Sequence, residues 1–396
     1  MANPYLKFNG KTVRVGSGGG RLISPFEPIP PYTLRVEFLN TPDCQSAGFD
    51  PTQGTGVESA PDWAYGTWRH VYGNVYDWTY TSDTWFVFYR SRNGNMYGSP
   101  WGKTNGGTDG YTHTDRFDTI AYRVVGANLT GVKYIPKLFS NAAKYLVSVA
   151  LFDTSKIECA GSMFYTTGTK APKYLTSLPD FDFSGINDES VPLGQTTSWA
   201  VNQSIQGLMY FCNNERVLTS TPNLVFPSSR SINTKQMYSS CAALTSATLN
   251  GLQSSNAEAM FSSCKSLTSA SLSNCVITTA YRMFEGGPSA PVPLTNGVTI
   301  SNVKVAVRAD EMFRYSLLPE IPLFDTAELG NANKMFDACY AVESGALALY
   351  QQMSSQENVP SHTGTFTNCG RDTVTGAAEL AQIPTDWGGT YTPPSE

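Results

Sequence analysis

Cysteine is the residue type whose spacing in this chain most invites a chemical interpretation. Three cysteines each follow a methionine by four residues, at Cys241, Cys264 and Cys339. Structural zinc sites usually take two ligands from a pair separated by two to four residues, and the sequence has no such cysteine pair. We therefore expect no metal site and no bound cofactor, and we expect these thiols to be buried as small apolar groups.

The other residue types that often act in catalysis are scattered. The three histidines, at positions 70, 113 and 362, have no metal-binding spacing, and no nucleophile-elbow motif occurs. A group of acidic residues lies in a segment that we interpret as a loop, where we expect solvated charges: Asp180, Asp182, Asp188 and Glu189. The sequence therefore predicts no catalytic residue. A glycan-cleaving enzyme is a weaker alternative, because it would need an acid pair of recognisable spacing.

A repeated methionine–aromatic pair is the main organising feature of the chain. Five copies begin at intervals of 23 residues, with one interval of 29: Met237, Met260, Met283, Met312 and Met335. Leucines follow the first two methionines after seven and twelve residues. Weaker copies are expected at Leu138–Phe139, Met163–Phe164, Leu208–Met209–Tyr210 and Thr365–Phe366. A period of about 23 residues is within the range of leucine-rich repeats.

The alternation within each unit predicts a short strand. Ala247 and Leu249 should point inward, and Ser246 and Thr248 outward, because successive side chains of a strand face opposite sides. One unit is too small to bury its apolar residues alone, so successive units should stack into a solenoid with parallel strands. The predicted fold class is an α/β repeat, a leucine-rich-repeat solenoid preceded by a small β-rich N-terminal domain.

The outward strand residues form the first candidate binding surface. They carry short hydroxyl side chains that could bond a glycan or a polar backbone, or could equally be inert surface: Ser246, Thr248, Ser269 and Ser271. A second candidate is an aromatic block over residues 63–89. Its tryptophans are expected either to stack on a ligand or to fill the core of a small β domain: Trp63, Trp68, Trp78 and Trp85.

Composition changes along the chain suggest four parts. We expect an N-terminal attachment segment over residues 1–32, an aromatic-rich β domain over 33–130, the solenoid over 131–343, and a C-terminal helix with a capping tail over 344–396. The tail is expected because a repeat array needs a cover for its last apolar face.

Between about residues 131 and 370 the units resemble BspA-like leucine-rich repeat proteins. The resemblance lies in the aromatic residue after methionine, the cysteine three residues further on, and phrases such as Leu-Phe-Asp-Thr at 151–154 and 323–326. That family includes bacterial surface adhesins and many virion proteins of phages and prophages that infect gut Bacteroidales. The opening of the chain resembles the phage-encoded members.

The resemblance implies a virion surface protein, a tail- or head-fibre component that binds a host-surface protein or glycan. The implied partners are other virion proteins, through the N-terminal segment, and the host surface. A decoration protein of the virion and a bacterial adhesin are the alternatives, and a homo-oligomer is left open. The formal net charge of −5 and the absence of any basic run argue against a nucleic-acid partner. No secretion signal and no apolar run long enough for membrane insertion is recognised, which favours the virion over an adhesin.

Overall fold

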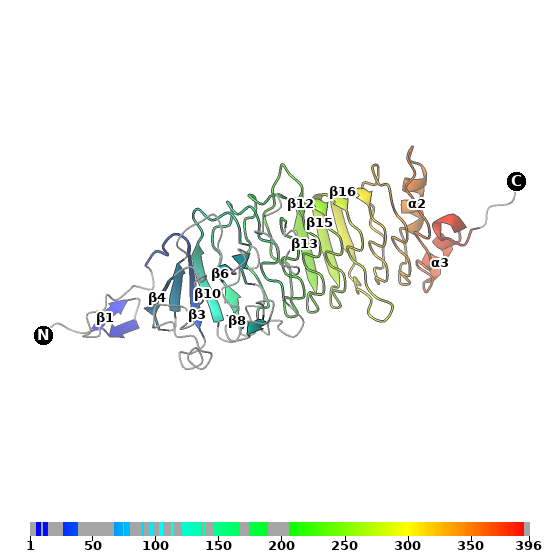
Figure 1. The fold of residues 1–396 in the computed structure, drawn as a ribbon. Coiled ribbons are helices and arrows are strands. Elements are labelled where there is room, and N and C mark those ends of the chain that lie inside the picture. The colour runs from blue at the N-terminus through cyan, green and yellow to red at the C-terminus, as the bar shows by residue number, and fades with distance from the viewer. Residues whose placement is uncertain are drawn as a thin grey trace.

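The chain has an elongated shape in the computed structural model, with the first described residues at one end and the last described residues at the other (Figure 1). The structure describes residues 5–8, 11–14, 27–38, 67–73, 75–79, 89–90, 96–97, 103–105, 112–114, 121–135, 138–139, 146–166, 174–188 and 206–391. One hydrophobic cluster extends through the described part, from Leu34 near the N-terminus to Trp387 near the C-terminus. The molecule is therefore organised around a single long interior.

A five-stranded sheet lies at the N-terminal end. Its order is β11-β10-β3-β5-β4, formed by β3 (Thr33–Phe38), β4 (Thr67–Tyr72), β5 (Val75–Thr79), β10 (Ala121–Asn128) and β11 (Ser148–Val149). Strand β10 pairs antiparallel with β3 and parallel with β11. It therefore joins an antiparallel sheet to the parallel stacking that follows, and the strand pairing continues across the expected domain boundary at residue 130.

Three two-stranded pairs are also present in this end of the chain. They are antiparallel and are formed by β1 (Tyr5–Phe8) with β2 (Lys11–Arg14), β6 (Tyr89–Arg90) with β7 (Met96–Tyr97), and β8 (Lys103–Asn105) with β9 (Thr112–Thr114).

A buried ion pair crosses the N-terminal sheet. Arg35 donates two hydrogen bonds to the Asp77 carboxylate, at 2.6 and 3.0 Å, and both side chains are almost inaccessible to solvent. Arg69 adds a third bond to Asp77 at 2.7 Å. The hydrogen bond to Asp77 raises the pKa of the Arg35 guanidinium. Such pairs are stable only when complete, because removing one partner leaves a buried charge uncompensated.

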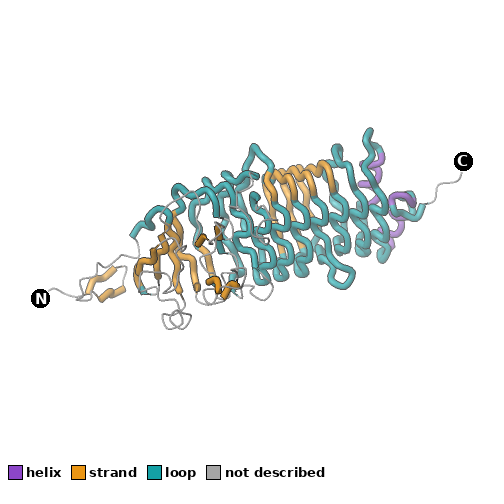
Figure 2. The backbone as a smooth tube through the Cα atoms, in the orientation of Figure 1, coloured by secondary structure: helices purple, strands orange, loops and turns teal. Residues whose placement is uncertain are grey.

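The central part is a β-solenoid of about six turns over residues 123–308, and we call each turn a rung. Its main strands are β12 (Ile232–Asn233), β13 (Ser246–Asn250), β14 (Gln253–Asn256), β15 (Ser269–Thr279) and β16 (Val298–Arg308). All pairings among them are parallel, and the stacked strands form one face of the molecule (Figure 2). The predicted solenoid with parallel strands is confirmed.

The side of each rung that carries the methionine is built from turns. Here every second backbone N–H donates to the next rung, as from Ala259 to the Tyr281 carbonyl at 2.8 Å and from Phe261 to that of Met283 at 2.8 Å. The N–H groups between them close tight turns within the rung, as from Met260 to the Ala257 carbonyl at 3.2 Å. The segment thus satisfies its backbone without forming a helix.

Left-handed residues explain why the helical half of an α/β repeat is missing. In each of these rungs the residue before the methionine position has a positive φ, as in Ala259 at 52°, Arg282 at 56° and Glu311 at 56°. Alanine, arginine and glutamate favour right-handed helix, so their local preference is overridden by the bonds between rungs. The α part of the predicted α/β repeat class is therefore not found in these rungs, and the two α-helices among the described residues both follow the strands.

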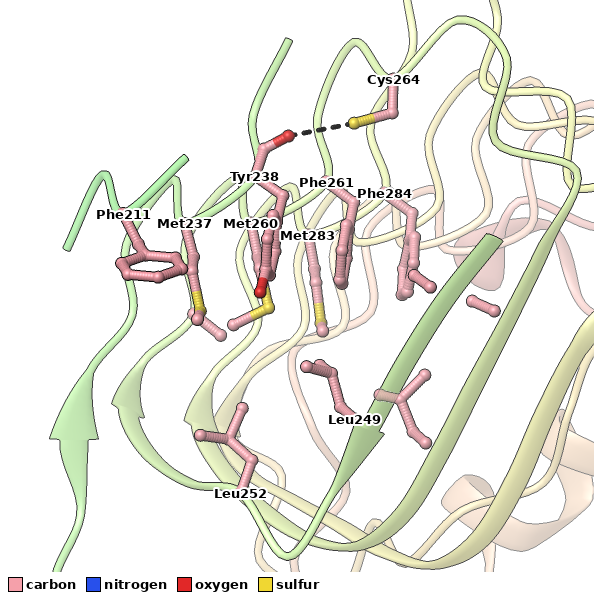
Figure 3. Packing of buried hydrophobic residues seen from close by; sticks show 14 of the residues in the cluster. Phe211, Met237, Tyr238, Leu249, Leu252, Met260, Phe261, Cys264, Met283 and Phe284 are labelled. Carbon is pink, nitrogen blue, oxygen red and sulfur yellow. Dashed lines mark hydrogen bonds between the residues drawn. The ribbon is translucent and has the colours of Figure 1, made fainter. Parts of the chain in front are cut away.

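The methionines and aromatic residues form the interior of the stack. All five methionines of the strong copies are essentially inaccessible: Met237, Met260, Met283, Met312 and Met335. The aromatic rings continue from rung to rung, with centroid separations of 5.6 Å for Tyr238–Phe261 and 5.3 Å for Phe261–Phe284 (Figure 3). Phe313, Phe336 and Phe366 continue the same column at 5.1 to 5.9 Å. The rings therefore form one aromatic column along the stack.

One weaker copy has a different register from the expected one. The aromatic position of each rung donates its N–H to the methionine position of the next, and here Cys212 donates to the Met237 carbonyl at 2.8 Å. Phe164 donates in turn to the Phe211 carbonyl at 2.7 Å. The pair is therefore Phe211–Cys212, and the prediction of Leu208–Met209–Tyr210 is wrong.

The C-terminal end of the stack is covered. Helices α2 (Ala346–Ser354) and α3 (Val374–Leu380) follow the last strands, and a short 3-10 helix, η2 (Thr385–Trp387), ends beside the final rung. The Trp387 ring lies 6.4 Å from Phe366 and 4.0 Å from His362, so it extends the aromatic column by one member. Helix α2 lies in the segment that the sequence pattern predicts as helical.

Candidate functional site

The predicted hydroxyl face is assembled by strands β13, β15 and β16. Ser246 lies opposite Ser269, and Thr248 opposite Ser271, in an unbroken parallel register. The inward neighbours Ala247 and Leu249 are buried while Thr248 is exposed, as the alternation predicts. Neighbouring strands in such a sheet lie about 4.8 Å apart, so the hydroxyls are presented in straight columns.

Strand β16 extends these columns by one rung. Thr299 lies opposite Ser271, and Ser301 opposite Ser273, and both β16 residues are exposed. The sequence pattern missed them because the interval after Met283 is longer than 23 residues. A hydroxyl column of Thr248, Ser271 and Thr299 therefore crosses three rungs.

The hydroxyls of this face differ from those next to them. Those of Thr245 and Thr268 donate to carbonyls of the preceding rung, at 3.0 and 3.1 Å. Within the described part of the chain, no hydrogen bond is formed by the hydroxyl of any of the four predicted residues: Ser246, Thr248, Ser269 and Ser271. These four hydroxyls are therefore available to donate to, and accept from, a partner outside the sheet.

An asparagine column borders this face. Asn274 donates to the side-chain oxygen of Asn250 at 3.1 Å, and Asn302 donates to that of Asn274 at 3.0 Å. Ser273 also donates to the Asn250 oxygen at 2.9 Å. These side-chain bonds between rungs hold the rim in one geometry. Sequence reasoning missed the column, although a recurring asparagine is a recognisable signal for a left-handed residue, as at Asn274 and Asn302.

The surface formed by these hydroxyls and amides carries no ionisable side chain on β13. Charged residues begin beyond it, with the Lys304–Glu328 ion pair at 2.6 Å on one flank. On the other flank, Asp180 accepts a hydrogen bond from the Asn223 backbone at 2.7 Å, and Asp182 is half-buried. The face is therefore suited to an uncharged polar partner.

The acidic loop residues have different roles in the structure. Asp188 accepts a bond from the Asn233 backbone and another from the Ser255 hydroxyl at 2.7 Å. It ties its segment to two later rungs, so the expectation of a solvated loop charge is wrong for this residue. Glu189 lies outside the described residues. No described pair of these carboxylates forms a catalytic arrangement with a histidine.

The cysteines act as buried hydrogen-bond donors. The Cys241 thiol donates to the Cys212 carbonyl at 3.0 Å, and the Cys339 thiol donates to the Phe313 carbonyl at 3.0 Å. None of the seven described cysteines forms a disulfide and all are buried, and burial raises the pKa of Cys264 and Cys339 to about 12. Among the described residues no group of three or more potential metal-ligating side chains is found.

The aromatic block is only partly described. Trp63 and Trp85 lie outside the described residues, and the description of Trp68 and Trp78 covers their backbone alone. These last two are paired across strands β4 and β5. In the same strands Tyr76 is buried, at 2% exposure, and Tyr72 is 37% exposed. Both expectations for the tryptophans, packing in a core and stacking on a ligand, therefore stay predictions.

The described helices and the comparisons with known proteins add two findings. No described helix is long and apolar enough to cross a membrane. Comparison with protein-family models, with curated proteins and with solved structures finds no match to this chain.

Proposed function

We propose that this chain is a phage virion surface protein, a tail- or head-fibre component that binds a host-surface receptor or glycan through its solenoid. On this proposal the rungs are leucine-rich repeats of the BspA-like type, with turns in place of helices. The proposal is supported by the recurring Met-aromatic and cysteine pattern of the units, and its binding half rests on the free hydroxyls of the strand face.

The observation that carries the binding role is the contrast between two sets of hydroxyls. The hydroxyls of Thr245 and Thr268 donate to backbone carbonyls of the chain itself. No such bond within the described residues is made by the hydroxyls of the four face residues: Ser246, Thr248, Ser269 and Ser271. Unpaired donors on a flat surface can bond a partner without first breaking an internal bond. The lack of charge on β13 favours a neutral glycan or a polar protein backbone over a polyanion.

The geometry favours a partner with a repeating structure. Columns one strand spacing apart, about 4.8 Å, offer the same group at regular steps, so a polymer could repeat one contact along the stack. Many weak contacts in parallel raise the overall affinity without any single strong site. This agrees with a surface polysaccharide as the bound molecule.

The test is binding of the purified full chain to arrayed neutral polysaccharides and to whole host cells. Ser271→Lys places a long charged side chain in the centre of the face and should reduce binding at least tenfold. The matched control is Ser262→Lys, which makes the same change on the turn side, and it should bind like the wild type. Equal binding by both variants would exclude the strand face as the binding surface.

Two other roles make different predictions. A decoration protein of the virion would bind purified particles or capsid components and not cells, with or without Ser271→Lys. A bacterial adhesin would be encoded away from genes for portal and tail proteins. Labelling of intact particles with an antibody to the solenoid distinguishes the virion roles from the adhesin.

A further inference from the structure

One rung of the solenoid carries a carboxylic acid at the position that cysteine occupies in the two rungs that follow it. Glu215 follows Phe211 by four residues, as Cys241 follows Met237 and Cys264 follows Met260. In the neighbouring rungs the thiol donates to a carbonyl of the rung before, as Cys264 does to Tyr238 at 3.1 Å. A carboxylate has no hydrogen to donate, so it cannot make that bond when ionised.

Glu215 is enclosed on both sides by neighbouring rungs. On the preceding rung, Thr166 donates its hydroxyl to the Asn214 carbonyl at 2.9 Å, and Asn214 donates its amide to the Thr166 carbonyl at 3.2 Å. On the following rung, the Asn214 N–H donates to the Ser239 carbonyl at 2.8 Å. These bonds close the stack around Glu215, which is 2% exposed.

No charge within the described residues compensates the Glu215 carboxyl. Its Oε2 atom is buried without a hydrogen-bond partner, and it takes part in no ion pair with a described lysine, arginine or histidine. The titratable groups that face it are the thiols of Cys212 and Cys241, from its own rung and the next. Both are themselves buried acids, so they add no stabilisation of a negative charge.

An isolated carboxylate is strongly disfavoured in a buried site, and such a group normally stays neutral instead. Desolvation accordingly raises the pKa of Glu215 well above its ordinary value of 4.5. The folded rung therefore holds a proton that the unfolded chain would release. Stability from this proton is fully present below the ordinary glutamate range and is lost as the pH rises through the raised value.

We propose that the protonation state of Glu215 controls how tightly one part of the solenoid is packed. The neutral form keeps the rungs at residues 162–166, 211–215 and 237–241 packed together, and ionisation opens them. Opening would expose the backbone bonds of Thr166 and Asn214 to water. The rungs from Met260 onward, which carry cysteine, glycine or serine at this position, would stay closed. A rise in pH would thus loosen the solenoid at these rungs alone.

The test is hydrogen exchange of the full chain, measured by mass spectrometry between pH 5 and pH 8 and corrected for the intrinsic exchange rate. This range lies below the ordinary titration of cysteine thiols. In the wild type, the opening constant of residues 206–241 should rise by up to about tenfold per pH unit, the effect of one released proton. The segment 260–283 should not change.

Two variants remove the titration in different ways. Glu215→Gln keeps the shape, and Glu215→Cys introduces the residue of the two following rungs, so both should show no rise with pH in residues 206–241. Glu343→Gln, which removes an exposed carboxylate, is the matched control and should behave like the wild type. The same rise in Glu215→Gln or Glu215→Cys as in the wild type, or no rise in the wild type, would overturn the proposal.

Discussion

The carboxylate of Glu379, in α3, accepts a hydrogen bond from the backbone N–H of Leu347 at 3.0 Å, in the first turn of α2. Its second oxygen accepts from the Gly345 N–H at 3.3 Å. Helix α2 has no cap of its own, because its N-terminal flanking residue is Gly345. A residue some thirty positions later in the chain therefore supplies the cap, and it links the two helices that cover the end of the stack.

Removing this distant cap should loosen the C-terminal cover. Glu379→Ala is expected to lower the free energy of unfolding by about 1–2 kcal/mol, because two N–H groups at a helix N-terminus lose their acceptor. Hydrogen exchange of residues 346–354 should quicken, measured by mass spectrometry. Glu357→Ala, at an exposed position just beyond α2, is the control. Unchanged protection in Glu379→Ala would show that α2 is held by packing alone.

The aromatic column should respond strongly to a gap in its middle. Phe284 is fully buried between Phe261 and Phe313, with centroids 5.3 and 5.1 Å away. Phe284→Ala is expected to cost about 3–5 kcal/mol of stability, since it removes a packed ring and leaves a cavity. Guanidinium denaturation measures the loss. Tyr174→Ala, at a residue 49% exposed, is the control. A loss below about 1 kcal/mol for Phe284→Ala would contradict the stacked interior.

Tyr238 is a member of the aromatic column whose substitution should stabilise the chain. Its hydroxyl is buried without a hydrogen-bond partner, and burial raises the pKa of the phenol well above its ordinary range. Tyr238→Phe removes the unsatisfied group and keeps the ring, so stability should rise by about 1 kcal/mol or more. Thermal unfolding checks this. A lower melting temperature would indicate that the hydroxyl has a partner in solution.

The cysteine thiols should be unreactive in the folded chain. Because burial raises the pKa of Cys264 and Cys339 to about 12 from 9.0, neither forms thiolate at pH 8. Alkylation by iodoacetamide, mapped by mass spectrometry, should label both only after unfolding. The same shift means that stability present below the ordinary thiol range is lost as the pH rises toward 12. Rapid labelling of the native chain would show that the rungs open readily.

Several features of the fold follow from local patterns. The period is readable because each rung must fill the same interior, so methionine, phenylalanine and leucine recur where the stack is closed. The direction of Ser246 and Thr248 is readable because a strand alternates its side chains. Thr299 and Ser301, which extend the hydroxyl face, escaped detection because an insertion before β16 hides the period in that rung.

Other features could not be read from one rung at a time. The register at Phe211–Cys212 is set by backbone bonds to Phe164 and Met237, and the nearby Met209 gives a misleading match to the repeat. The backbone conformation on the turn side of the rungs could not be predicted from residue type either. Ala259 and Arg282 have helical preferences and yet adopt left-handed conformations.

The amino-acid sequence by itself determined that this protein stacks repeated units and which strand residues point outward, because periodicity and alternation are properties of neighbouring residues. Only the tertiary structure decided which hydroxyls are left free, which residues turn left-handed, and that Glu215 has no partner. Those properties depend on the bonds and the burial that each rung receives from the rungs on either side, and no single unit contains that information.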